Sequence, residues 1–162
     1  MIELSDEEFY NALSIEDDLG MVIRAHIHIE HWIDRFLHSA IPRYNLYAKD
    51  INANYKTKVL LCCALGLSPE LKVPLNLIGE LRNKFAHRPS YKLTSSDVSN
   101  LHNALSTTHK QHLKKAYNTL ALHYKREESS FAKLGDIERL NLLFMLLRTK
   151  LKKANSQLNN IL

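Results

Sequence analysis

Residues 16–40 read EDDLGMVIRAHIHIEHWIDRFLHSA, and this stretch decides the fold class. Its apolar side chains recur at spacings of three and four residues, the period of one helix face; they are Leu19, Val22, Ile29, Ile33, Phe36 and Ala40. A second set widens the stripe, namely Ile23, Ile27, Leu37 and Ile41. Pro42 ends the pattern, because the residue before a proline avoids helical conformation. The stretch predicts a long helix packed on more than one side.

The rest of the chain also carries helix signals. Ser5-Asp6-Glu7-Glu8 has the spacing of a capping box and predicts a short helix. Gly135-Asp136 opens the last helix, whose predicted core face is Leu140, Leu143, Phe144 and Leu147. Between them we expect a helix over about 55–65 ended by Gly66, one over about 68–86 opened by Ser68-Pro69 and broken or restarted at Pro74, and one over about 97–126. Residues 44–54 and 88–96 are expected to be connections.

The composition agrees with a helical bundle. The 162 residues include only 4 Gly and 4 Pro, too few for the many turns of a sandwich or barrel. No internal repeat or Gly/Ser-rich linker divides the chain. We therefore predict a single all-α domain over residues 1–162, a bundle of five or six helices, in which residues 1–15 are an acidic arm or a short helix.

Two features of the sequence bear on where the protein is located in the cell. No apolar run approaches the ~20 residues of a membrane-spanning helix, and the chain begins with acidic residues rather than a signal sequence. Cys62 and Cys63 are adjacent on a predicted helix and point in different directions. This pattern favours reduced thiols, and with them a cytoplasmic protein that does not insert into a membrane.

The charge is unevenly distributed. The first 20 residues hold seven acidic side chains and no Lys or Arg, so the remaining residues hold 22 basic and 10 acidic side chains, a net charge of +12. A basic body suits a polyanion such as RNA or DNA. A solvated surface without a partner, or an acidic segment that shields the basic one, fits the same numbers.

The densest chemistry lies in residues 81–87, Leu-Arg-Asn-Lys-Phe-Ala-His. At 100° per residue, Arg82 falls on the apolar side of the helix, so it needs an anionic partner such as Glu30 or a ligand phosphate. His87 stands where Pro89 forces the helix to end. There it can serve as a general acid or base. A structural arginine and a helix-capping histidine would give the same short pattern.

This motif resembles the signature of the HEPN superfamily, small helical domains with an Arg-x4–6-His motif. Residues 22–41, with Glu30 inside, look like the family's amphipathic helix, and residues 58–67 look like the helix that leads into a Leu-Gly-Leu turn. The order of these features is particularly similar to the mannitol operon repressor branch. The likeness covers about residues 15–90.

The resemblance implies an endoribonuclease that needs no metal or cofactor, acting as a toxin or defence component with a cognate antitoxin. Motif residues from two subunits of a homodimer would meet in one cleft. Arg82 would stabilise the phosphate charge, Asn83 would orient, and His87 would assist attack of the ribose 2′-hydroxyl or protonate the leaving group. Glu30 would support Arg82.

Two alternatives remain open. In the repressor branch the domain is regulatory, which implies a non-enzymatic transcription regulator that acts through protein partners. A dimeric scaffold, in which Arg82 and His87 only stabilise the interface, is the other.

The remaining candidates concern RNA and metal. Basic side chains that could contact RNA are Lys84, Arg88, Lys110, Lys114 and Lys115. His28/His31, His26/Glu30 and His31/Asp34 have helical metal-ligand spacing, but no second cluster supplies further ligands. We therefore expect no metal site and interpret His26 as a hydrogen-bonded core histidine.

Overall fold

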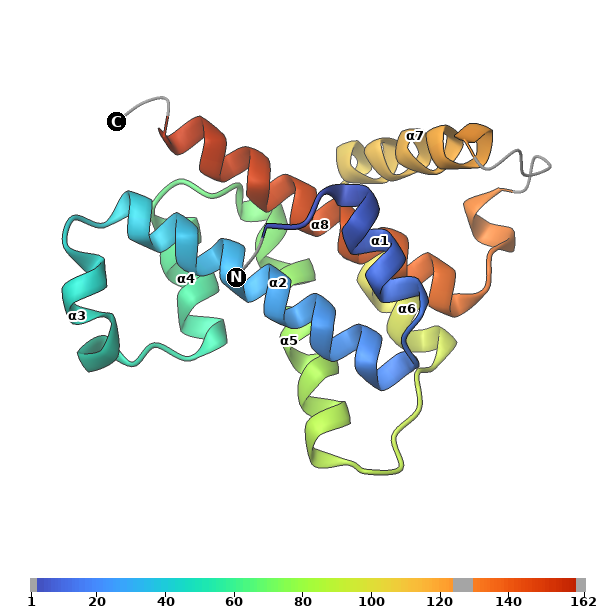
Figure 1. Ribbon diagram of the computed structural model, residues 1–162, viewed down its shortest axis with the longest axis horizontal. Helices are drawn as coiled ribbons and strands as arrows, with labels where there is room; N and C mark the ends of the chain where they lie inside the picture. The colour runs from blue at the N-terminus through green and yellow to red at the C-terminus, as the bar shows by residue number, and fades with distance from the viewer. Residues whose placement is uncertain (1–2, 124–129, 160–162) are drawn as a thin grey trace.

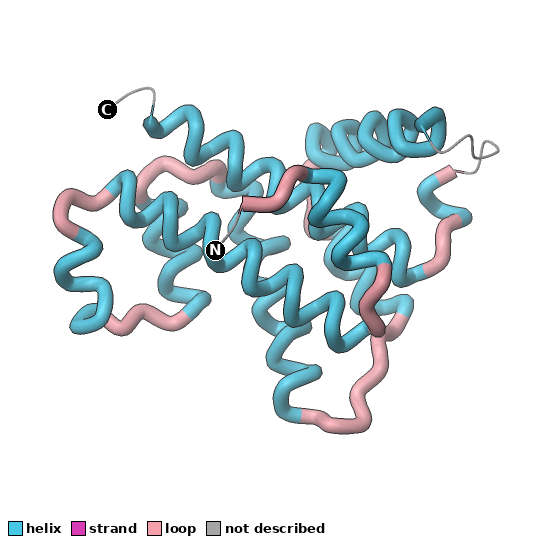
Figure 2. Tube along the Cα trace, viewed as in Figure 1, coloured by secondary structure: helices cyan, strands magenta, loops and turns pink. Residues whose placement is uncertain are grey.

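The computed structural model describes residues 3–123 and 130–159, and this part of the chain consists of helices joined by loops (Figures 1 and 2). It contains eight α-helices, no strand and two 3-10 turns, η1 (Pro69–Leu71) and η2 (Phe131–Lys133). The α-helices are α1 (Asp6–Ser14), α2 (Asp18–Ala40), α3 (Tyr44–Ile51), α4 (Tyr55–Ala64), α5 (Lys72–His87), α6 (Ser95–Asn103), α7 (Thr107–His123) and α8 (Asp136–Asn159). The all-α prediction is confirmed.

The predicted number of five or six helices is too low for two local reasons. Residues 44–51 form α3, which begins after Arg43 without a side-chain cap, so the sequence carries no start signal for this helix. It buries only Tyr44 and leaves Leu46, Tyr47 and Ile51 exposed. The segment 97–126 divides into α6 and α7, because the Ser106 hydroxyl accepts a hydrogen bond from the His109 backbone and begins a new helix. Residues 124–126 of that prediction lie outside the described residues.

Several local predictions are confirmed. Ser5 and Glu8 form the capping box of α1, and Gly66, with φ +107°, follows α4 in a left-handed conformation. Pro74 does not break α5, because it lies in the first helical turn, where a backbone N–H has no acceptor within the helix.

The core is built around α2 and α8, which make the most extensive helix–helix contact (Figure 1). The predicted core face of α8 is confirmed, since Leu140, Leu143, Phe144 and Leu147 are fully buried. Helix α1 packs on both α8 and α2, while α4 and α5 pack on α2 and on each other. None of the described helices is long and apolar enough to cross a membrane.

The acidic N-terminal region is tied to this core. Asp6 pairs with Arg148, which is only 1% exposed. Arg148 also donates to the Leu4 carbonyl and lies over the Phe9 ring. Residues 6–14 therefore form a packed helix rather than an arm.

Candidate functional site

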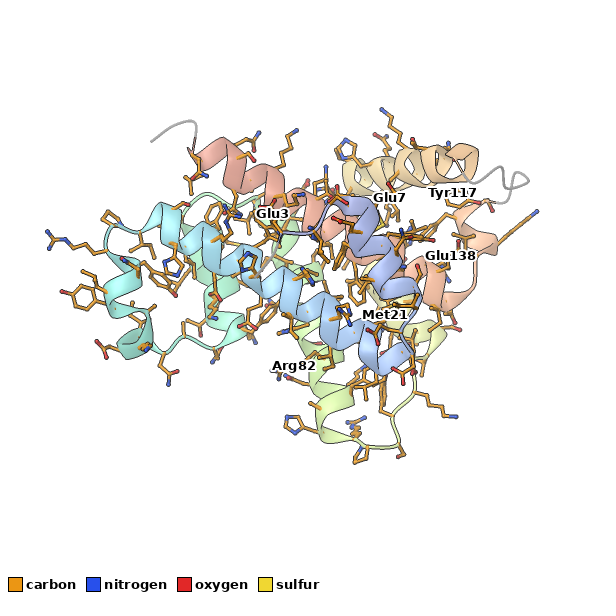
Figure 3. All side chains as sticks on the ribbon, in the orientation of Figure 1. Glu3, Glu7, Met21, Arg82, Tyr117 and Glu138 are labelled. Carbon is orange, nitrogen blue, oxygen red and sulfur yellow. The ribbon has the colours of Figure 1, made fainter. Side chains whose placement is uncertain are left out.

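The motif helix opens on a cleft of about 520 Å³, within the usual size of a ligand site. Three segments line it: His26 and Glu30 of α2, residues 54–56 at the start of α4, and Asn76, Gly79, Glu80, Arg82 and Asn83 of α5. Figure 3 shows Arg82 on α5, the helix that packs against both α2 and α4. Arg82 and Asn83, predicted from the sequence, thus share one site.

Arg82 is half-buried in this cleft. Its Nη1 donates a hydrogen bond to Oδ1 of the neighbouring Asn83 at 2.9 Å. Within the described part of the chain, no carboxylate lies at ion-pair distance from Arg82. A guanidinium in this position keeps most of its donors available for an anion.

Glu30 reaches the cleft, but the expected ion pair with Arg82 is not formed. Its Oε1 instead accepts from Lys58 Nζ at 2.9 Å, and Lys58 also pairs with Asp34 at 2.9 Å. Burial alone would lower the pKa of Lys58, but these two hydrogen bonds raise it above its ordinary value. Glu30 is therefore held by Lys58, and Arg82 is left for another partner.

His26 is the site residue that the sequence interpretation missed. It is buried, at 4% exposure, but it makes no hydrogen bond to any described residue and packs against the Tyr55 ring with centroids 4.6 Å apart. Its Nδ1 lies 3.7 Å from Glu30 Oε2. Burial lowers the pKa of His26, with Arg82 and Lys58 adding to the effect and Glu30 opposing it. The imidazole is therefore neutral at neutral pH and can accept a proton.

The wall between α4 and α5 depends on a close contact. The Tyr55 hydroxyl donates to the Leu75 carbonyl at 2.9 Å, and burial raises the pKa of Tyr55. A Cβ atom at Gly79 would lie 2.7 Å from the Tyr55 ring. Gly79 therefore allows α5 to approach α4. Nearby, Asn76 Oδ1 is buried without a hydrogen-bond partner.

His87 does not line the cleft. It is the last residue of α5 and is exposed. It lies five positions after Arg82, which corresponds to about 7.5 Å along the helix axis. The motif is therefore divided: Arg82 and Asn83 face the cleft, while His87 is presented to the surroundings.

The structure does not bring the other predicted RNA contacts to the cleft. Lys84 pairs with buried Asp97 at 2.7 Å, and this hydrogen bond raises the pKa of Lys84. Arg88 is exposed beyond the end of α5. Lys110, Lys114 and Lys115 belong to α7, which packs mainly on α8.

The described residues contain no group of three or more His, Cys, Asp or Glu side chains that could hold a metal ion. Of the histidines on α2, His28 packs against Phe9 and His31 against Trp32. Cys62 is buried, and burial raises the pKa of its thiol to about 12.

The cleft therefore brings together an arginine, an amide and a neutral imidazole. Comparison of the chain with protein-family models, curated proteins and solved structures gives no match.

Proposed function

We propose that the protein binds RNA through a backbone phosphate in the Arg82 cleft and cleaves it without a metal ion, as a toxin or defence ribonuclease. One observation carries the proposal. A half-buried guanidinium without a carboxylate partner lies in the same cleft as a buried imidazole whose pKa is lowered. An anionic substrate group would pair with the guanidinium, and a proton-transfer step would use the imidazole.

The reaction needs only side-chain chemistry. The ribose 2′-hydroxyl gives its proton to His26 and attacks the adjacent phosphorus, while Arg82 stabilises the charge on the phosphoryl oxygens. Asn83, which accepts a hydrogen bond from Arg82, orients the guanidinium. The bond from phosphorus to the 5′ oxygen breaks, a proton is returned to that oxygen, and the products carry a 2′,3′-cyclic phosphate and a 5′-hydroxyl.

His87 has a role in this proposal through a second subunit. The HEPN resemblance implies a homodimer whose motif residues converge, and an exposed His87 at the end of α5 is available to protonate the leaving oxygen in the site of a neighbouring copy. The homodimer, in which the motif residues of the two subunits meet, is thus part of the proposal.

The test is purified protein incubated with total RNA and excess chelator. We expect wild type to release fragments with cyclic phosphate ends, and Arg82→Ala to reduce the rate by about 100-fold or more. His26→Gln and His87→Ala should each reduce it by at least about 100-fold. Lys49→Gln, an exposed charge-removing change on α3, is the matched control and should leave the rate unchanged.

Growth gives a second measurement. Expression of wild type should arrest growth, and Arg82→Ala or His87→Ala should relieve the arrest. Intact RNA with wild type, together with equal growth of all variants, would exclude the nuclease.

A second candidate is a non-enzymatic regulator that works through protein partners. It is favoured by the position of His87, which lies outside the Arg82 cleft. If the protein is such a regulator, we expect no RNA cleavage with any variant. We also expect a changed transcript level at one operon when the protein is removed from the cell.

A further inference from the structure

A second cavity, of about 730 Å³, lies between the C-terminal half of α8, the turn 65–71 and the start of α7. It shares no lining residue with the Arg82 cleft. Its apolar lining includes the buried side chains of Phe36, Leu67 and Leu71 and the half-buried Leu158. Apolar side chains that face a cavity of this size are suited to an apolar ligand.

Two ammonium groups stand at the same cavity. Lys150 and Lys153 are three residues apart on α8, so they lie on one side of the helix. Neither has a carboxylate at ion-pair distance within the described residues. Lys150 Nζ lies 2.6 Å from His112 Nδ1. Burial lowers the pKa of Lys150, and repulsion from Lys153 adds to this, while Glu70 opposes it. An anion between the two lysines would remove the repulsion.

The third polar group is His109, whose ring forms part of the cavity wall. It is 6% exposed, and its Nδ1 is buried without a hydrogen-bond partner. Its Nε2 lies 3.9 Å from Glu70 Oε2, too far for a hydrogen bond. His109 therefore forms part of the wall, and the two lysines supply the positive charge at the cavity.

We propose that this cavity binds a small amphipathic anion, with a single carboxylate or phosphate head held by Lys150 and Lys153 and an apolar chain against Phe36, Leu71 and Leu158. Both parts of the ligand follow from the lining: the head from two lysines that lack a carboxylate partner in the described part of the chain, and the chain from apolar walls. This binding site is independent of RNA cleavage, so either proposal can fail without the other.

The experiment is calorimetric titration of the full chain at pH 7.5 with decanoate, below the concentration at which it forms micelles. Decyl phosphate, decanol and decylammonium are titrated in parallel. We expect one decanoate or decyl phosphate per chain, and decanol to bind at least about tenfold more weakly because it lacks the charge-assisted contacts. Decylammonium should not bind. The stronger of the two anions identifies the head group.

Variants test the two halves of the site separately. Lys150→Gln with Lys153→Gln should weaken decanoate binding at least about tenfold and leave decanol unchanged. Ala154→Phe, at a half-buried position of the wall, should fill the cavity and weaken every ligand without a change of charge. Lys114→Gln is the control. Circular dichroism and melting temperature confirm that each variant is folded.

Three results would overturn the proposal. They are no binding of either anion to folded wild type, decanol binding as tightly as decanoate, and unchanged decanoate affinity in the double lysine variant.

Discussion

Arg82 and Arg148 show how two arginines on helices acquire opposite roles. Arg148 is almost fully buried and is held by Asp6 and the Leu4 carbonyl, so its charge stabilises the docking of the N-terminal region. Arg82 is half-buried at a cleft, and among the described residues its side chain donates a hydrogen bond to Asn83 alone. The first is a structural residue, and the second is available for a ligand.

The Arg148 interaction gives a prediction on stability. Arg148→Ala removes the Asp6 pair and the packing on Phe9, and should lower the free energy of unfolding by about 2–3 kcal/mol. Lys152→Ala is the matched control. Lys152 also pairs with Asp6, but it is more exposed, so its loss should cost under about 1 kcal/mol. Urea unfolding measures both, and equal losses would contradict the assignment.

His26 gives a prediction on pH, which depends on the proposed ribonuclease activity. Because burial lowers the pKa of His26, the base becomes protonated only below the ordinary titration range of histidine. The fall of the cleavage rate toward acidic pH should therefore have its midpoint below pH ~6.5. A midpoint of this acidic fall at or above pH ~6.5 would exclude His26 as the essential base.

At the scale of elements, the cleft depends on how closely α5 approaches α4. Gly79→Ala would place a methyl group against the Tyr55 ring, which is fixed by its hydrogen bond to Leu75. Alanine normally stabilises a helix relative to glycine by about 1 kcal/mol, but here overpacking should destabilise the protein by about 1–3 kcal/mol.

A double-mutant cycle checks this cause. In a Tyr55→Leu background, the same Gly79→Ala change should become neutral or stabilising, because the ring is gone. An equal cost in both backgrounds would show that the contact is not responsible.

A second group of contacts joins α5 to α6. Asp97 accepts hydrogen bonds from Lys84, Tyr91 and Thr94, and the Leu93 backbone donates to Asp18 of α2 at 3.0 Å. These contacts hold the loop that follows His87. Lys84 therefore has a structural role in this loop through its pair with Asp97.

The lowered pKa of Asp97 predicts how the free energy of unfolding depends on pH. Burial raises its pKa, but the hydrogen bonds from Lys84, Thr94 and Tyr91 outweigh this and lower it to about 2. An unfolded aspartate titrates near ~3.9. The stabilisation, about 2 kcal/mol, is therefore complete above pH ~4 and is lost as pH falls through about 2.

Asp97→Asn provides the comparison. It should be less stable than wild type at pH 7, and the difference should narrow between pH 4 and 2 in urea unfolding. A constant difference over that range would contradict the role of the carboxylate.

At the scale of the whole molecule, the basic side chains form separate groups. Figure 1 shows α7 on the far side of α2 and α8 from the end of α5. Lys110, Lys114 and Lys115 are therefore remote from the cleft that holds Arg82.

This separation predicts a dependence on RNA length. Replacing Lys110, Lys114 and Lys115 by Gln should leave the affinity for a tetranucleotide unchanged. For long RNA it should weaken binding and reduce the slope of log K against log salt by about 2. Filter binding over a salt series measures both, and a weaker tetranucleotide complex would place α7 at the cleft.

The sequence by itself determined the helical class, most helix ends and the core face of α8. These depend on periodicity and on caps within a few residues, such as Ser5 with Glu8 and the glycine after α4. It also placed Arg82 on the inner side of its helix. It missed α3 and the break before α7, because the first begins without a capping side chain and the second depends on a single serine cap.

Only the tertiary structure decided which partners the polar groups have. Asp6 and Arg148 lie 142 positions apart, and the cleft combines segments around residues 26–30, 54–56 and 76–83. Helical periodicity gives the face on which a side chain lies, but it does not give the helix that covers this face or the charge opposite. For that reason Glu30 pairs with Lys58, Lys84 pairs with Asp97, and His26 rather than His87 shares the cleft with Arg82.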